Sequence, residues 1–155
     1  MALINPLSAV LQKLADVIAA DPDIEAFCQE KYKRSMATRL SFHKRAELMP
    51  AAMPLSMITC PKTEVENLMG MQAKLTHHVL IYLMISQEDK DKALIELMEL
   101  EELVDQALMR NSSLGGLVSD IDPSQGSAND EGWFHPKYSV VKIILVKRHV
   151  SQEAR

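Results

Sequence analysis

Residues 71–87 read MQAKLTHHVLIYLMISQ, which is the clearest strand pattern in the chain. β-branched and aromatic residues are frequent here, as they are in strands generally. Apolar side chains occupy both alternating faces, so this strand is expected at the centre of a sheet or with a partner on its second face. The expected faces are Val79, Ile81, Leu83 and Ile85 on one side and His78, Leu80, Tyr82 and Met84 on the other.

A long amphipathic helix is predicted directly after this strand, at about residues 88–110. Ser86 to Asp89 resembles a capping box, and the early acids together with the late Arg110 suit the helix dipole. Apolar residues recur at helical spacing and predict a continuous buried stripe. The stripe consists of Leu94, Leu97, Leu100, Val104, Ala107 and Leu108.

Two helices are predicted near the N-terminus. Asn5 can cap the first helix and Pro6 fits its first turn. Asp21-Pro22 would end that helix and start a second, shorter one by the same device. The apolar residues at helical spacing are Leu7, Val10, Leu11, Leu14, Val17 and Ile18 in the first helix, and Ile24, Phe27 and Cys28 in the second.

Three further strands are expected. The segment LSMITC at 55–60 lies between prolines, LVSDID ends at Asp122, and YSVVKIILVKRHV at 138–150 is rich in Val and Ile. The segment after Pro61, PKTEVENLMG, is interpreted as a turn or exposed loop. A long loop is expected at about 122–136, where Gly, Ser, Asn, Asp and Pro follow one another closely.

These elements predict a single α+β domain covering residues 1–155. The predicted order is helix, helix, strand, strand, helix, strand, strand. This order favours a small, mainly antiparallel sheet packed by an N-terminal helix and by a long helix between strand pairs. With 155 residues, 47% of them hydrophobic and 25% charged, the chain suits one globular domain. No signal peptide or membrane span is predicted, because Gln12, Lys13 and Asp16 interrupt the apolar N-terminus.

Charge is divided between two segments of the chain. Residues 31–45 hold six Lys or Arg residues and no acid, and residues 88–105 hold eight acids and two lysines. Met36, Leu40 and Phe42 suit either an edge strand or a long arm. The basic segment is interpreted as an irregular arm at about 31–49 that contacts DNA phosphates, an acidic neighbouring subunit or only water. Its candidate contact residues are Lys31, Lys33, Arg34, Arg39, Lys44 and Arg45.

The acidic helix offers Glu96, Glu99 and Glu102 as a candidate partner face. Pairing it with the basic arm of another copy would give a head-to-tail contact, which closes into a ring if the rotation allows. Two independent solvated faces explain the same pattern equally well. The net charge of −4 argues against a dedicated nucleic-acid binder.

The stretch NSSLGGLVSDID, which begins at Asn111, has paired glycines but does not match a phosphate-binding loop. Such a loop follows a strand, ends in Gly-Lys-Ser/Thr and precedes a helix. Here a helix is expected before the glycines and a strand after them, with no lysine nearby. Leu114, Gly115 and Gly116 are therefore predicted to form a helix-to-strand turn.

No catalytic, cofactor-binding or metal-ligating residue is predicted. His77 and His78 are adjacent on a strand and so point to opposite faces, and the other histidines are remote from them. Neither Cys28 nor Cys60 has metal-like spacing, and both are interpreted as small core residues in a reduced compartment. The sequence predicts no enzyme.

The order of these segments resembles the tail terminator and minor tail proteins of long-tailed bacteriophages and prophages. The resemblance rests on MPLSMITC, THHVLIYLMIS, LIELMELEELVDQALMRNSSLGGLVSDID and YSVVKIILVKRHV, and it covers roughly residues 50–149. In that family a helix ending in a Leu-Gly-Gly turn stands between two strand pairs, and Leu114-Gly115-Gly116 matches the turn.

The resemblance implies a structural virion protein that is made in the host cytoplasm. It would form a homo-oligomeric ring, usually a hexamer, that caps the tail tube, ends its growth and presents a docking surface to the head connector. Implied partners are further copies of the chain, the tail-tube protein with or without a sheath, the neck protein and packaged DNA, with no cofactor and no membrane. Another neck or tail-completion protein, or a non-viral α+β protein-binding module, is the alternative.

Overall fold

The computed structural model describes residues 6–40, 50–70, 72–123, 127–129 and 135–151. The helices are α1 (Leu7–Ala20), α2 (Pro22–Tyr32) and α3 (Lys90–Arg110), with short 3-10 turns η2 (Pro50–Ala52) and η3 (Leu114–Gly116). The strands are β1 (Ala37–Leu40), β2 (Leu55–Leu68), β3 (Gln72–Ser86), β4 (Asp120–Asp122), β5 (Ser127–Asn129) and β6 (Lys137–Ser151).

The strands form one mixed, mostly antiparallel sheet in the order β1-β2-β3-β6-β4, and β5 also pairs with β6. Among the described strands, only β1 and β2 run parallel to each other. β3 and β6 pair along their whole length, from Gln72 opposite Ser151 to Ser86 opposite Lys137. The predicted α+β class and mainly antiparallel sheet are therefore confirmed, and so is the central position of the strand at 71–87.

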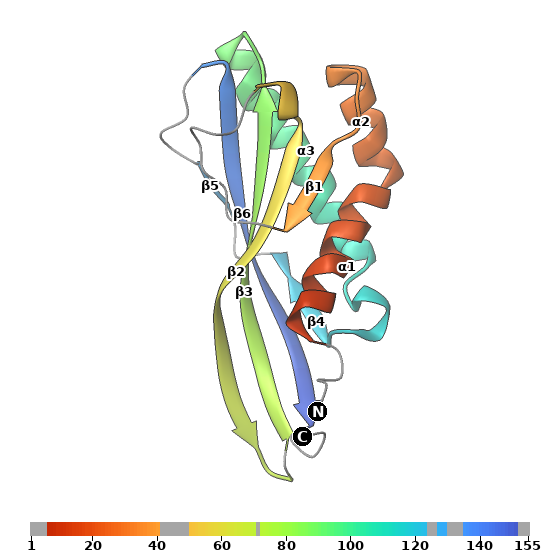
Figure 1. The fold of residues 1–155 in the computed structure, drawn as a ribbon, viewed down its shortest axis with the longest axis vertical. Coiled ribbons are helices and arrows are strands. Elements are labelled where there is room, and N and C mark those ends of the chain that lie inside the picture. Colours follow the sequence, from red (N-terminus) through yellow and green to blue (C-terminus); the bar gives the residue numbers. More distant parts are fainter. Residues whose placement is uncertain (1–5, 41–49, 71, 124–126, 130–134, 152–155) are drawn as a thin grey trace.

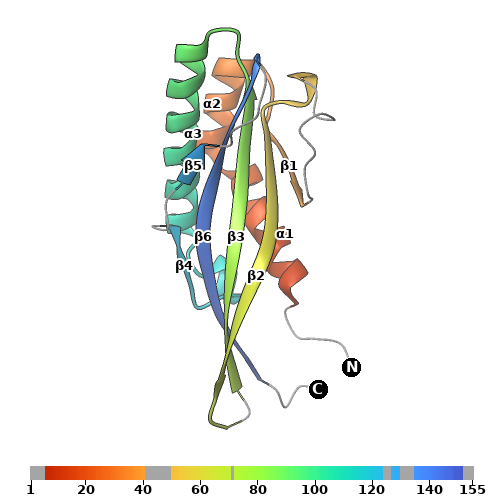
Figure 2. The same ribbon diagram turned by 90° about the vertical axis from the view of Figure 1, so that its left-hand side faces the viewer.

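All three α-helices pack against one face of this sheet, as Figures 1 and 2 show. The odd-numbered residues Val79, Ile81, Leu83 and Ile85 of β3 point into the core beneath the helices. The opposite face carries a second buried cluster, formed by Met53, Leu55, Met57 and Met84. Both faces of β3 are thus used, because its side chains alternate between the two clusters.

The N-terminal helices begin and end largely as their sequences predict. Asp21 ends α1 and caps α2, since its carboxylate accepts a hydrogen bond of 3.0 Å from the backbone N–H of Ile24. Helix α1 begins at Leu7, and Pro6 is its N-cap residue without a side-chain cap, so Pro6 does not occupy the first helical turn. The predicted cap, Asn5, lies outside the described residues.

The strand predicted at 55–60 is too short, and the loop predicted after Pro61 is wrong. β2 continues to Leu68 and forms a long hairpin with β3, with a register shift between Thr59 and Lys62. Beyond Cys60 its side chains are exposed, which explains their polar composition. Figure 1 shows this hairpin extending past the ends of the helices.

Where the structure describes the segment 31–49, the irregular arm is wrong and the alternative of an edge strand is confirmed at Leu40. Lys31 belongs to α2, and Ala37–Leu40 form the edge strand β1, so only a short connection separates two regular elements. Lys33 ends α2 with a left-handed backbone (φ 60°). Residues 41–49 lie outside the described part of the chain.

Helix α3 starts at Lys90, and its cap is Asp89 and not the predicted Ser86. The Asp89 carboxylate accepts hydrogen bonds from the backbone N–H groups of Asp91 (2.9 Å) and Lys92 (3.2 Å). The predicted stripe is buried at five of its six positions, and Leu94 is 58% exposed. The loop predicted at about 122–136 is interrupted by β5.

Candidate assembly surfaces

One candidate surface is basic and lies at the β1 edge of the sheet. We call the exposed residues Lys31, Lys33, Arg34 and Arg39 the basic surface. Lys31 lies in α2, Lys33 and Arg34 follow it, and Arg39 lies on β1. The Arg34 guanidinium donates a hydrogen bond to the Ala51 carbonyl. That bond ties the end of α2 to η2 and so orients the surface. The other two predicted contacts, Lys44 and Arg45, lie outside the described residues.

Glu96 is not part of an exposed acidic face, contrary to the prediction. Its side chain is buried, and its two carboxylate oxygens accept hydrogen bonds from the Tyr32 hydroxyl (3.1 Å) and the Gln87 amide (2.9 Å). Burial raises the pKa of the Tyr32 phenol, and the nearby Glu96 carboxylate raises it further. Glu96 therefore connects the end of α2 with α3 inside the protein.

Glu99 and Glu102 are exposed on α3, and large apolar side chains accompany them. Exposed apolar residues scattered singly are normal on a protein surface, but three between Leu94 and Met98 form a patch of the kind found at contact surfaces, and Met109 lies further along the same helix. We call this patch, with its two acids, the α3 surface. Its apolar members are Leu94 (58% exposed), Ile95 (55%), Met98 (55%) and Met109 (66%).

A buried cation lies where α3 crosses the sheet. Lys142 of β6 points into the helix-covered side, and its ammonium group is 2.9 Å from Asp105 Oδ2 and 3.5 Å from Glu101 Oε1. A buried ammonium group requires such carboxylates, because an unpaired charge in the interior is strongly unfavourable. With two carboxylates around one ammonium, the triad carries one residual negative charge.

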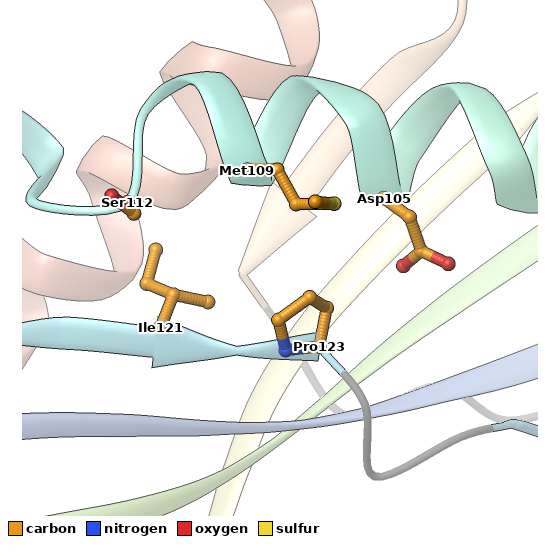
Figure 3. Close-up of a pocket in the computed structure, with 5 residues that line it drawn as sticks. All are labelled: Asp105, Met109, Ser112, Ile121 and Pro123. Carbon is orange, nitrogen blue, oxygen red and sulfur yellow. The ribbon is translucent and has the colours of Figure 1, made fainter.

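A groove opens beside this triad, between α3 and β4. It has a volume of about 520 Å³, and its described lining consists of Asp105, Met109, Ser112, Ile121 and Pro123. Figure 3 shows Asp105 and Met109 pointing from α3 toward β4, and Ile121 and Pro123 facing them from below. Asp105 Oδ1 is buried and has no hydrogen-bond partner among the described residues.

The Leu-Gly-Gly segment forms η3, which connects α3 to β4. All three residues have positive φ: 49° at Leu114, 70° at Gly115 and 94° at Gly116. The Leu114 side chain is buried and anchors the turn to the core. This burial holds the Leu114 backbone in a left-handed conformation that is unfavourable for a non-glycine residue. The geometry is that of a helix-to-strand turn, and it offers no site for a phosphate between a strand and a following helix.

The histidines are structural where they are buried. His77 Nε2 accepts a hydrogen bond from Arg148 Nε (2.9 Å), so its proton lies on Nδ1 and is donated to Thr63 Oγ1 (2.8 Å). Burial, reinforced by the Arg148 charge, lowers the pKa of His77 to about 4. His78 points to the other face, and no group of three metal-ligating side chains occurs in the described part of the chain.

The cysteines differ in environment. Cys28 is fully buried, and burial raises its pKa to about 11, so this thiol stays protonated and unreactive. Cys60 is partly buried at the start of the exposed part of β2 and packs against the core, so the interpretation as core residues holds fully for Cys28 and in part for Cys60. Both are free thiols.

The groove is the surface that sequence patterns did not reveal. Its one sequence signal was Lys142, a charge between Val141 and Ile143 on a strand otherwise rich in apolar residues. Such a residue must find acids from another element, and Glu101 and Asp105, four residues apart on α3, supply them. The pairing of Lys142 with Glu101 and Asp105 depends on which helix crosses β6. The tertiary structure decides this, and the local sequence does not.

No protein-family model and no curated protein sequence matches this chain. Within the described residues, no helix combines the length and the apolar character that crossing a bilayer requires. The surfaces described above are therefore the basis on which a function can be argued.

Proposed function

We propose that this chain is a structural virion protein, a phage tail terminator or a closely related neck protein. In this role it forms a homo-oligomeric ring that caps the tail tube, ends tube polymerisation and provides the docking surface for the head connector. Its role is assembly and involves no catalysis. The sequence resemblance and the arrangement of the charged surfaces both support this role.

The observation that carries the proposal is the position of two opposite charges at opposite edges of one sheet. Arg39 of the basic surface lies on β1, the first strand in the sheet order, whereas Lys31 and Lys33 flank Tyr32, which bonds to Glu96 of α3 in the same chain. The acidic groove lies at the other edge, since Asp105 of α3 pairs with Lys142 of β6 and faces β4 across the groove. One chain cannot bring its two edges together, but successive copies can, and such head-to-tail contacts close into rings.

The β2–β3 hairpin supports a second kind of contact. It extends beyond the helices (Figure 2) and ends in exposed apolar side chains, with Val65 62% and Met69 96% exposed. A projecting hairpin with an apolar tip suits contact with a different ring, because ring neighbours already use the sheet edges. We propose that the β2–β3 hairpin contacts the tail-tube protein.

Tube polymerisation tests the function directly. Purified chain is added to polymerising tail-tube subunits encoded beside its gene, and tube lengths are measured in negative-stain images. We expect tubes to stop growing and to carry a ring at one end. Met69→Lys is expected to weaken capping without changing ring size, and Lys92→Glu, an exposed change on α3, serves as the matched control.

Tails assembled in cells without this gene provide the decisive counterpart. We expect tails of irregular length that fail to join heads. Tails of normal length that join heads normally would eliminate the terminator role. Light scattering of the purified protein then distinguishes a ring from a monomeric protein-binding module.

A further inference from the structure

We infer that the groove between α3 and β4 receives the end of β1, Arg39 and Leu40, from a second copy of this chain. This contact specifies the subunit interface of the ring proposed above and rests on that proposal. In this contact, the acidic partner of the basic strand end is the groove that contains Asp105, and not the exposed glutamates of α3.

The groove has the chemistry of a receptor for an apolar side chain next to a cation. Met109, Ile121 and Pro123 give it apolar walls, and Met109 is 66% exposed with nothing described packed over it. The Asp105 carboxylate lies in the same lining with Oδ1 unpartnered. A buried carboxylate oxygen without a donor is unfavourable, and a cationic donor from outside would remove that cost.

The local charge supports a cationic occupant. The triad below the groove has Glu101 and Asp105 against Lys142 alone, which leaves one negative charge. Asp120 on β4 is exposed at the same edge of the sheet and adds to it. An incoming carboxylate would be repelled here, whereas an arginine can donate to Asp105 Oδ1 in the fixed geometry of its guanidinium group.

The end of β1 supplies the matching pair of side chains. Arg39 is exposed, and the adjacent Leu40 is exposed to 37% although it is a large apolar residue. Consecutive strand residues point to opposite sides, so a strand end entering a two-walled groove can contact both walls at once.

The occupant must come from another copy, because β1 and β4 are the two ends of the strand order. Groove and strand end thus meet only between molecules, and each molecule offers one of each. This is the condition for a heterologous interface that repeats around a ring.

Disulfide trapping tests the contact. Leu40→Cys and Ser112→Cys are combined in a Cys60→Ser background, which removes the partly buried thiol and leaves Cys28 buried. We expect mild oxidation to give a ladder of linked oligomers that ends at the ring size on non-reducing gels. A mixture of the two single variants should give dimers only. The matched control replaces Ser112→Cys by Lys92→Cys, which is exposed near the start of α3, outside both the groove and the α3 surface, and should give no ladder.

A pair of charged substitutions provides an independent measurement. Met109→Glu places a like charge in the groove and should weaken self-association at least about tenfold in light-scattering titrations. Lys92→Glu, an exposed change on the same helix that lies outside both the groove and the α3 surface, should change it less than about twofold. Rings that form normally in Met109→Glu, with no ladder from the cysteine pair, overturn the groove contact and leave the ring proposal intact. A protein that shows neither oligomers nor trapped species at any concentration, alone or with tail-tube subunits, overturns both.

Discussion

Removing the Tyr32 hydroxyl tests whether Glu96 is an internal connector or a partner-facing acid. In the Tyr32→Phe variant, Glu96 keeps its bond from Gln87 and loses the 3.1 Å bond from Tyr32. Because Glu96 is only 8% exposed, water cannot replace the lost donor without a local rearrangement. The variant should therefore be less stable but assemble normally.

The expected loss follows from the environment of the bond. Hydrogen bonds to charged groups contribute about 1.5–3 kcal/mol, and the Tyr32 side chain is only half-buried, so we expect the free energy of unfolding to fall by about 2 kcal/mol. For a chain of this size, that change lowers Tm by about 4–8 °C. Glu96→Gln, which removes the charge, should interact with Tyr32→Phe in a double-mutant cycle by more than about 0.5 kcal/mol.

Urea unfolding followed by far-ultraviolet circular dichroism provides the assay, with equal slopes required for comparison. Tyr138→Phe is the matched control, because the Tyr138 hydroxyl bonds to His135 at an exposed position (2.9 Å) and its loss should cost less than about 0.5 kcal/mol. A Tyr32→Phe variant as stable as this control would refute the reasoning. So would a Glu96→Gln variant that keeps its stability but loses self-association.

Two further perturbations address the His77 network and the turn. The pKa of His77 is about 4, below the 6.5 of an unfolded chain, so the unfolded state takes up a proton first as the pH falls from 6.5 to 4. The free energy of unfolding should fall over that range by up to about 3 kcal/mol more in the wild type than in His77→Gln, and parallel pH profiles would contradict this. Gly116→Ala should cost about 1–2 kcal/mol by backbone strain alone, since φ is 94° and no atom lies within 4 Å of the added Cβ. An unchanged urea midpoint for Gly116→Ala would show that the turn relaxes.

The sequence predicted the long, strongly periodic elements well. β3, β6 and α3 were predictable because each buries an apolar row over many residues, and alternation or helical spacing then identifies the element. The capping role of Asp21 was also visible, because Asp-Pro is a strong signal for a helix start. These features depend only on local residues.

The outer half of β2 could not be predicted, because none of its residues from Pro61 onward is buried. Pro61 suggested a strand boundary, yet a proline is tolerated on an edge strand where no neighbour needs its N–H. β1 covers β2 only from Leu55 to Ile58, and the register shift after Thr59 accommodates the change. The outer half of β2 is a strand because it pairs with β3, and this pairing cannot be read from the composition of the segment.

The candidate site was harder to predict than the fold. Glu96, Glu99 and Glu102 share a spacing of three residues, but the buried stripe of α3 includes Ala93, Leu97 and Leu100 and so takes Glu96 with it. Tyr32 and Gln87 provide the donors that make this burial possible. The groove likewise depends on where β4 returns beside α3, which no local pattern specifies.

The central pairing of β3 with β6 has a consequence for folding kinetics. Its partner residues are between 51 and 79 positions apart in the chain, whereas the β2–β3 hairpin closes within four residues. Closing a longer loop costs more conformational entropy, and chains dominated by distant pairings fold in roughly milliseconds to seconds. We therefore expect the β2–β3 hairpin to form first. The edge of β3 that pairs with β6 stays exposed until β6 adds to the sheet. During that interval the newly made subunit is most exposed to edge-to-edge aggregation, so folding must finish before copies of the chain meet.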